Sequence, residues 1–140
     1  MTVLVDTPIW SIALRRRATD RNGHDERLYQ EWLRLIRLGE AAIIGVMRQE
    51  VLSGIRDERR YEDLRSALRA VDDLRVTAVD HKAAARCYNR CRAAGITGTV
   101  GDMLICAVAL RFDLPIFTTD RDFIRYSKNL PIRLHTTHGT

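Results

Sequence analysis

The sequence has few residues of the kinds that specify disulfide-rich, disordered or membrane-spanning chains. It contains three cysteines, three prolines and eight glycines in 140 residues, and 46% of its residues are hydrophobic. The odd cysteine number and the absence of a secretory signal pattern predict a reducing, cytoplasmic location, with Cys87, Cys91 and Cys106 as small buried residues. The longest apolar run, 103–110, is far shorter than the roughly 18 residues of a membrane span. One globular domain is therefore expected.

Lysine is nearly absent, although the chain is basic. Only Lys82 and Lys128 contribute to the 23 Lys and Arg residues, which outnumber 18 acidic residues and give a net charge of +5. The planar guanidinium of arginine pairs well with phosphate, so this charge is compatible with a nucleic-acid partner. It is equally typical of a solvated basic surface, and the charge alone does not decide between the two.

Short apolar segments alternate with amphipathic segments along the chain. This alternation predicts an α/β fold, a three-layer α/β/α sandwich with a mainly parallel central sheet. Residues 1–134 are expected to form the domain, and 135–140 a polar, frayed tail. The expected strands are 2–5, 41–44, 74–76, 114–117 and 130–134, and the expected helices are 7–16, 25–38, 46–55, 57–71, 79–94, 102–112 and 120–126.

Acidic residues stand where the ends of the predicted strands should meet. Asp6 directly follows the first strand, and Asp120 follows the fourth after two threonines. Glu50 lies in the helix after the second strand, and Asp102 opens the apolar helix before the fourth. The carboxyl ends of parallel strands share one edge of a sheet, so the topology brings these acids together.

Clustered carboxylates predict a bound cation. Like charges at close range raise one another's pKa values unless a positive charge offsets them. Oxygen ligands suit Mg²⁺ or Mn²⁺, which activate water and stabilise in-line displacement at phosphorus. An acidic metal pocket in a basic protein therefore indicates phosphodiester hydrolysis. Taken singly, each acid also fits a structural role, as a helix or turn cap or as an exposed helix residue.

Four segments, in this order, resemble motifs of the PIN-domain ribonucleases and, within them, of the VapC toxins of bacterial VapBC toxin–antitoxin pairs. Each motif alone is weak, but the set with these spacings spans residues 1–134 and is specific. Pro8 departs from the family pattern, which commonly has serine there, so it is given no catalytic role. The segments are VLVDTPIW with Asp6, VMRQEVLSGI with Glu50, GDMLICAVAL with Asp102, and PIFTTDRDF with Asp120 and Asp122.

The resemblance implies a PIN domain that binds one or two Mg²⁺ or Mn²⁺ ions and cleaves RNA. In the toxins of the family the substrate is tRNA or rRNA, and cleavage stops translation. Thr118 is expected to orient a carboxylate or the attacking water, and Asp122 is a further supporting candidate. The metal ligands and catalytic residues implied are Asp6, Glu50, Asp102 and Asp120.

The resemblance also implies partners. A VapB-type antitoxin would inhibit a homodimer within a heterotetramer or larger assembly, placing a basic side chain in the acidic pocket. Operator DNA would be bound only through the antitoxin, and no membrane is involved. The helices at 25–38 and 57–71 carry Tyr29, Trp32 and Tyr61 as candidates for a dimer or antitoxin face, although core packing explains these aromatics equally well.

Three other function classes compete with this interpretation. A catalytically inactive PIN-like module would bind RNA or protein without cutting, but all four acid positions are filled. A phosphoacceptor signalling domain also has Asp after a strand, yet it needs a neighbouring acid pair and a lysine that Lys128 does not supply. A DNA-binding transcription factor would fit the charge, but no segment has the pattern of a recognition helix.

Overall fold

The computed structural model describes residues 1–137. Its centre is a parallel sheet in the order β2-β1-β3, built from Val3–Val5 (β1), Ala41–Ala42 (β2) and Ile116–Phe117 (β3). Val3 pairs with Ala41 on one side, and Leu4 pairs with Ile116 on the other. The predicted α/β class with a parallel sheet is confirmed.

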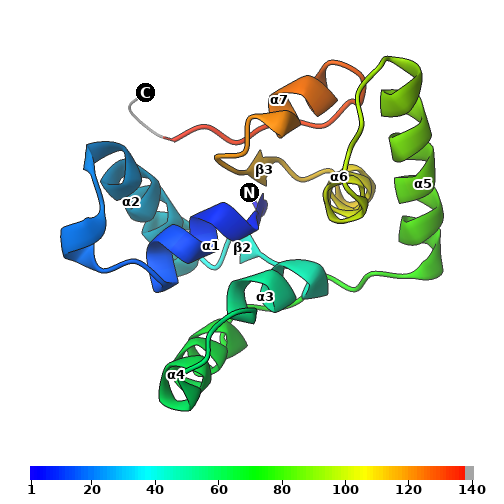
Figure 1. The fold of residues 1–140 in the computed structure, drawn as a ribbon. Coiled ribbons are helices and arrows are strands. Elements are labelled where there is room, and N and C mark those ends of the chain that lie inside the picture. Colours follow the sequence, from blue (N-terminus) through cyan, green and yellow to red (C-terminus); the bar gives the residue numbers. More distant parts are fainter. Residues whose placement is uncertain (138–140) are drawn as a thin grey trace.

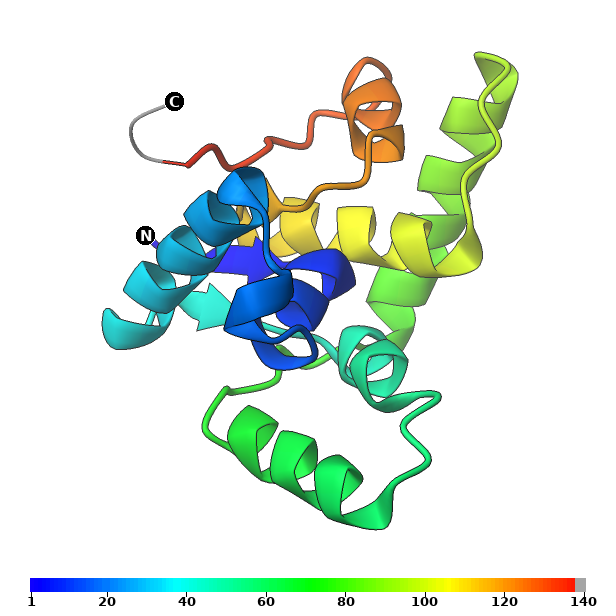
Figure 2. The same cartoon turned by 60° about the vertical axis from the view of Figure 1, so that its left-hand side comes forward.

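Helices cover both faces of this sheet. Helices α1 and α2 lie over one face, and α6 and then α5 lie over the other (Figure 1). Helix α4 lies beyond α3 at the periphery, as the turned view shows (Figure 2). The helices are α1 (Thr7–Leu14), α2 (Gly23–Arg37), α3 (Gly45–Leu52), α4 (Glu58–Arg69), α5 (Ala78–Ala93), α6 (Val100–Phe112) and α7 (Asp122–Ser127), with a 3₁₀ turn at Ala18–Asp20.

Two of the expected strands are wrong. Within residues 1–137, the segment 74–76 contributes no bridge, and the single parallel bridge at this edge joins the preceding Asp73 to Ile43. The segment 130–134 contributes only the single parallel bridge from Leu134 to Ile116. Pro131 has no N–H to donate to a ladder, which disfavours regular pairing at that edge. The sheet is therefore narrower than the apolar pattern indicates, and loops cover both of its edges.

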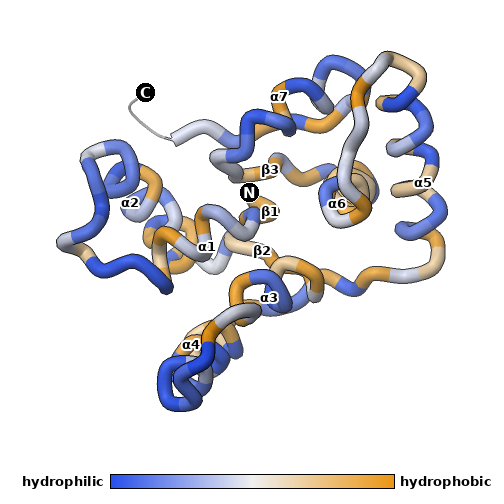
Figure 3. The backbone as a smooth tube through the Cα atoms, viewed as in Figure 1, coloured by the Kyte–Doolittle hydropathy of each residue, from blue (hydrophilic) through white to orange (hydrophobic). Residues whose placement is uncertain are grey.

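The hydrophobic core lies on both faces of the sheet, against α6 on one side and α1 and α2 on the other. Apolar residues gather on the strands and on α6, whereas α4 is mostly hydrophilic (Figure 3). Leu4 and Val108 are fully buried. Helix α6 buries six of its 13 residues, so the expected apolar helix at 102–112 is covered along its middle, whereas Phe112 at its end is exposed. The three cysteines are buried as expected. No helix in the described part of the chain is long and apolar enough to cross a membrane.

The tail expected from residue 135 begins with an anchored residue. The His135 backbone N–H donates to the Ile116 carbonyl at 2.8 Å. Its Nε2 lies 2.6 Å from the buried Glu31 carboxylate, and its ring packs edge-on against Phe117. Ordered contacts thus extend past the predicted boundary at 134, while residues 138–140 of the expected tail lie outside the described residues.

A buried ion pair ties α6 to α5. Asp80 is 1% exposed, and Arg111 donates to both of its carboxylate oxygens, at 2.6 and 2.9 Å. Arg111 also donates to the carbonyl of Arg75 at 2.6 Å. These bonds hold the pKa of Asp80 below its usual value, chiefly through the guanidinium. The pair fixes the axial position of α6, the helix that carries Asp102 at its other end.

We expect Arg111→Met to destabilise the fold by about 2 kcal/mol, because it leaves Asp80 buried without its cation. This expected loss of stability is smaller than for a fully buried pair, because the Arg111 side chain is 36% exposed. Urea denaturation measures the loss. The control is Arg65→Met, which breaks an exposed pair with Glu62 and should cost under about 0.5 kcal/mol. Equal losses in the free energy of unfolding for the two variants would show that the buried pair stabilises the fold no more than the exposed pair does.

Candidate metal centre

Asp6 occupies the junction between β1 and α1. Its carboxylate accepts a hydrogen bond from the backbone N–H of Thr7 at 2.9 Å and so caps α1. Thr118, just after β3, donates its hydroxyl to the other oxygen at 2.7 Å. Pro8 fits the first turn of α1, where a backbone N–H would lack an intrahelical partner. Asp6 therefore has both the capping role and the strand-end position that its sequence context suggests.

Glu50 reaches the same edge from α3. The Thr7 hydroxyl donates to its Oε2 at 2.8 Å. On its other side, Glu50 lies against Gly101 in the first turn of α6, where an added Cβ would be 3.6 Å from Oε1. The exposed carboxylate of Glu50 is thus held between the start of α1 and the start of α6.

Asp102 lies in the first turn of α6. Thr99 caps this helix by accepting from the backbone N–H of Asp102 at 3.0 Å. The hydroxyl of Tyr126, from α7, donates to the Asp102 Oδ2 at 2.8 Å. An acid in a first helical turn is also favoured by the helix dipole.

Asp120 and Asp122 complete the cluster from the loop between β3 and α7. One carboxylate oxygen from each of Asp102, Asp120 and Asp122 lies within 4.8 Å of the others. Within the loop, Asp120 accepts from the backbone N–H of Asp122, and its own N–H donates to the hydroxyl of Thr118. Asp122 also pairs with Arg125. The structure thus brings together all five acids that the sequence singles out. Asp102, Asp120 and Asp122 form one group. Asp6, Glu50 and Asp102 form a second, electrostatically coupled group, so Asp102 belongs to both.

The electrostatics favour a positive charge in this pocket. Burial raises the pKa of Asp6 from 3.8 to about 6, opposed by its bonds from Thr118 and Thr7 and reinforced by the charges of Asp102 and Glu50. Burial likewise raises the pKa of Asp102, and its neighbouring acids add to the effect. Carboxylates whose charged forms are disfavoured gain most from a bound cation.

The donor set fits a hard divalent metal ion. The cluster of Asp102, Asp120 and Asp122 contains only carboxylates. Oxygen ligands of this kind suit Mg²⁺ or Mn²⁺, whereas zinc sites usually include His or Cys. Asp6 is linked to the cluster electrostatically through Asp102. The arrangement is able to hold a cation, and Glu50, which acts electrostatically on Asp6, is exposed to solvent.

Two hydroxyl donors at the site escape sequence reasoning. The hydroxyls of Thr7 and Tyr126 donate to the carboxylates of Glu50 and Asp102, yet the sequence pattern identifies neither residue as part of the site. Thr7 had a weak signal, because it follows Asp6 in the opening motif. Tyr126 had none, since its bond joins residues 24 positions apart in two different helices. Thr118, by contrast, lies where the sequence predicts, with its hydroxyl on Asp6.

The sequence of residues 3–129 matches the profile of the PIN domain. The chain belongs to the PIN-domain family. The predicted family is thus confirmed. This PIN domain is 32% identical over 126 residues to a VapC ribonuclease of Mycobacterium bovis and to ribonuclease VapC11 of Mycobacterium tuberculosis. The aligned region is 86% of this chain and 88% of each relative.

A solved structure shares the fold of this PIN domain. The VapBC2 complex from Rickettsia felis, bound to a DNA fragment from its promoter, aligns with a TM-score of 0.72. The alignment covers 96% of this chain and 98% of that chain at 16% identity. At this identity the likeness concerns the fold alone, and it agrees with the parallel sheet and helical layers described above.

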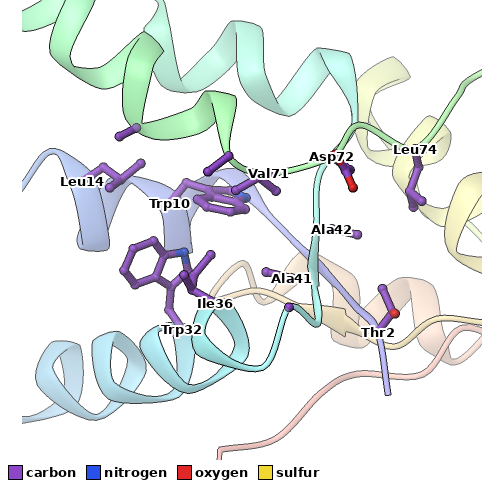
Figure 4. Close-up of a pocket in the computed structure, with 13 residues that line it drawn as sticks. Thr2, Trp10, Leu14, Trp32, Ile36, Ala41, Ala42, Val71, Asp72 and Leu74 are labelled. Carbon is purple, nitrogen blue, oxygen red and sulfur yellow. The ribbon is translucent and has the colours of Figure 1, made fainter.

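A mainly apolar cavity, whose lining includes none of the five clustered acids, lies between α2, α4 and β2 of the PIN domain. Its volume is about 470 Å³, and Trp10 from α1 and Trp32 from α2 line it side by side, with their rings packed edge to face at a centroid distance of 5.9 Å (Figure 4). Trp32 is 8% exposed, so core packing accounts for most of its surface. Its indole Nε1 is buried without an acceptor among residues 1–137. Tyr29 stacks against the Trp32 ring, with centroids 5.7 Å apart.

Proposed function

We propose that this protein is a metal-dependent endoribonuclease that acts as the toxin of a toxin–antitoxin pair. The observation that carries the proposal is the all-carboxylate cluster of Asp102, Asp120 and Asp122. The charge of Asp102 also acts on the buried Asp6, whose pKa is raised. The VapC ribonuclease relatives supply the reaction class. The substrate we propose is tRNA or rRNA, and the place of action is the cytoplasm, which contains these substrates and keeps thiols reduced.

The proposed ligands of one or two Mg²⁺ or Mn²⁺ ions are Asp6, Glu50, Asp102 and Asp120. When bound, such an ion lowers the pKa of a water and offsets charge at the scissile phosphate. Thr118 keeps Asp6 oriented toward the pocket, and Thr7 does the same for Glu50. One carboxylate oxygen of Asp122 forms an ion pair with Arg125, which favours a role for Asp122 in supporting the metal ligands. Water attack in line would leave a 5′-phosphate and a 3′-hydroxyl.

The VapC relatives and the fold shared with a VapBC complex support the partners that we propose. A VapB-type antitoxin would hold a toxin homodimer inactive in a heterotetramer or larger assembly, and operator DNA would be bound through the antitoxin. The negative pocket suits a basic antitoxin side chain. We assign the dimer or antitoxin contact to α2 and α4, the two helices predicted for it, because both line the apolar cavity beside Trp32.

RNA cleavage by the antitoxin-free protein tests the proposal. We expect discrete products from total tRNA and rRNA with Mn²⁺ or Mg²⁺ and none in EDTA, because the carboxylates alone cannot activate water. Denaturing gels with end-labelled RNA read out the products and their termini. Cleavage that persists in EDTA would overturn the metal-dependent mechanism.

Asp120→Asn and Asp63→Asn provide matched variants for this experiment. Both remove one carboxylate charge, but Asp63 is exposed on α4, away from the cluster. Loss of cleavage in the first and wild-type cleavage in the second would tie activity to the acidic site. A wild-type protein that binds Mn²⁺ and RNA but cleaves no RNA would instead favour the inactive binding module.

A further inference from the structure

Three acids of the site share one structural feature. Each accepts a hydrogen bond from a hydroxyl group on a different segment of the chain, with donor–acceptor distances of 2.7 to 2.8 Å. A ligand held in this way keeps its orientation before the metal arrives, which raises metal affinity. The three pairs are Thr118 with Asp6, Thr7 with Glu50, and Tyr126 with Asp102.

Tyr126 is the most rigid of these donors. Its side chain is 1% exposed, and its ring packs edge-on against Phe123 with centroids 5.2 Å apart. A buried hydroxyl cannot turn to water for another acceptor, so its bond to Asp102 is strongly maintained. Thr7 and Thr118, in contrast, lie in half-buried positions near the pocket mouth.

The location of Tyr126 couples two parts of the cluster. Tyr126 belongs to α7, the helix that begins at Asp122, two residues after Asp120. Its hydroxyl crosses to Asp102 on α6, so one bond sets the distance between the two elements that supply the three clustered carboxylates.

We propose that Tyr126 is a positioning residue of the metal centre, which orients Asp102 and holds α7 against α6 so that the cluster is formed before the ion binds. The proposal rests on the metal site of the proposed function. It assigns Tyr126 no contact with substrate or metal, and its effect is on metal affinity.

Tyr126→Phe tests this assignment, because it removes the hydroxyl and keeps the ring. We expect the Kd for Mn²⁺, measured by electron paramagnetic resonance of the free ion, to rise about tenfold. Cleavage should fall at low Mn²⁺ and return toward the wild-type rate at saturating Mn²⁺. Tyr88→Phe is the control, since Tyr88 is a half-buried tyrosine on α5 whose hydroxyl has no bond to a described residue.

The outcomes separate this proposal from the proposed function. A raised Kd in Tyr126→Phe, with thermal unfolding in EDTA close to that of Tyr88→Phe, supports the positioning role. An unchanged Kd, or a stability loss without a change in Kd, overturns it and leaves Tyr126 as a packing residue. Absence of Mn²⁺ binding in the wild type would overturn the metal centre itself, and the positioning role with it.

Discussion

Asp102→Asn is expected to abolish RNA cleavage while preserving the fold. Asp102 is clustered with Asp120 and Asp122 and acts electrostatically on Asp6, so its loss removes a proposed ligand from the centre of the site. Replacing a residue that merely supports a metal ligand costs about 10- to 100-fold in affinity or activity, and loss of a ligand should exceed that. The Asn oxygen can still accept the hydroxyl of Tyr126, which keeps α6 and α7 together.

Two measurements check this expectation. Cleavage rates at fixed Mn²⁺ should fall by more than about 100-fold relative to wild type. Thermal unfolding gives an independent readout, because Mn²⁺ at about 100 times its Kd stabilises the wild type by about 2.7 kcal/mol and should leave the variant unchanged. Wild-type cleavage by Asp102→Asn would remove the metal mechanism proposed above.

The second large expected effect is a loss of stability with rising pH in the metal-free protein. The pKa of Asp6 is about 6 in the folded protein against 3.8 for an ordinary aspartate, so the folded state binds the proton more tightly. Unfolding therefore releases a proton between these values, and raising the pH favours the unfolded state. The shift corresponds to about 3 kcal/mol, present below pH 4 and lost as the pH rises through 6.

Comparison with Asp6→Asn isolates this effect. Urea denaturation in EDTA from pH 4 to 8 gives the free energy of unfolding of both proteins. The wild-type value minus the variant value should fall by roughly 2 to 3 kcal/mol across this range, because carboxylates remote from Asp6 contribute equally to both. Saturating Mn²⁺ should remove most of the decline, since the cation replaces the proton. A difference that stays constant with pH would show that burial does not shift Asp6.

The strand-end acids were predictable because sheet topology determines where they meet. Asp6 and Asp120 follow apolar strands, and parallel strands end at one edge, so their approach follows from the pattern alone. Asp122 was expected only as a supporting residue, yet its carboxylate lies within the cluster. Its two-residue spacing from Asp120 fits either a turn or a ligand, and only the fold of the loop shows which oxygens converge.

The details that escaped prediction depend on contacts between distant segments. The strands expected at 74–76 and 130–134 have the right residue types, but pairing also requires free backbone groups at the sheet edge. His135 looks like a tail residue because its anchor, the buried Glu31, lies far away in the sequence. The bond of Tyr126 to Asp102 is likewise invisible to periodicity, which reports burial and not the partner of a hydroxyl group.

The hydrogen bond from Thr118 to Asp6 spans 112 residues of sequence and has a consequence for protein synthesis. A chain made from its N-terminus carries Asp6 long before it carries the segment that orients it, and β1 lacks its β3 neighbour until then. Domains fold as units once their segments are available. The nascent polypeptide thus has no assembled acidic cluster at this edge of the sheet, and under the proposed function a ribosome making the chain meets no cleavage activity until most of the chain has been translated.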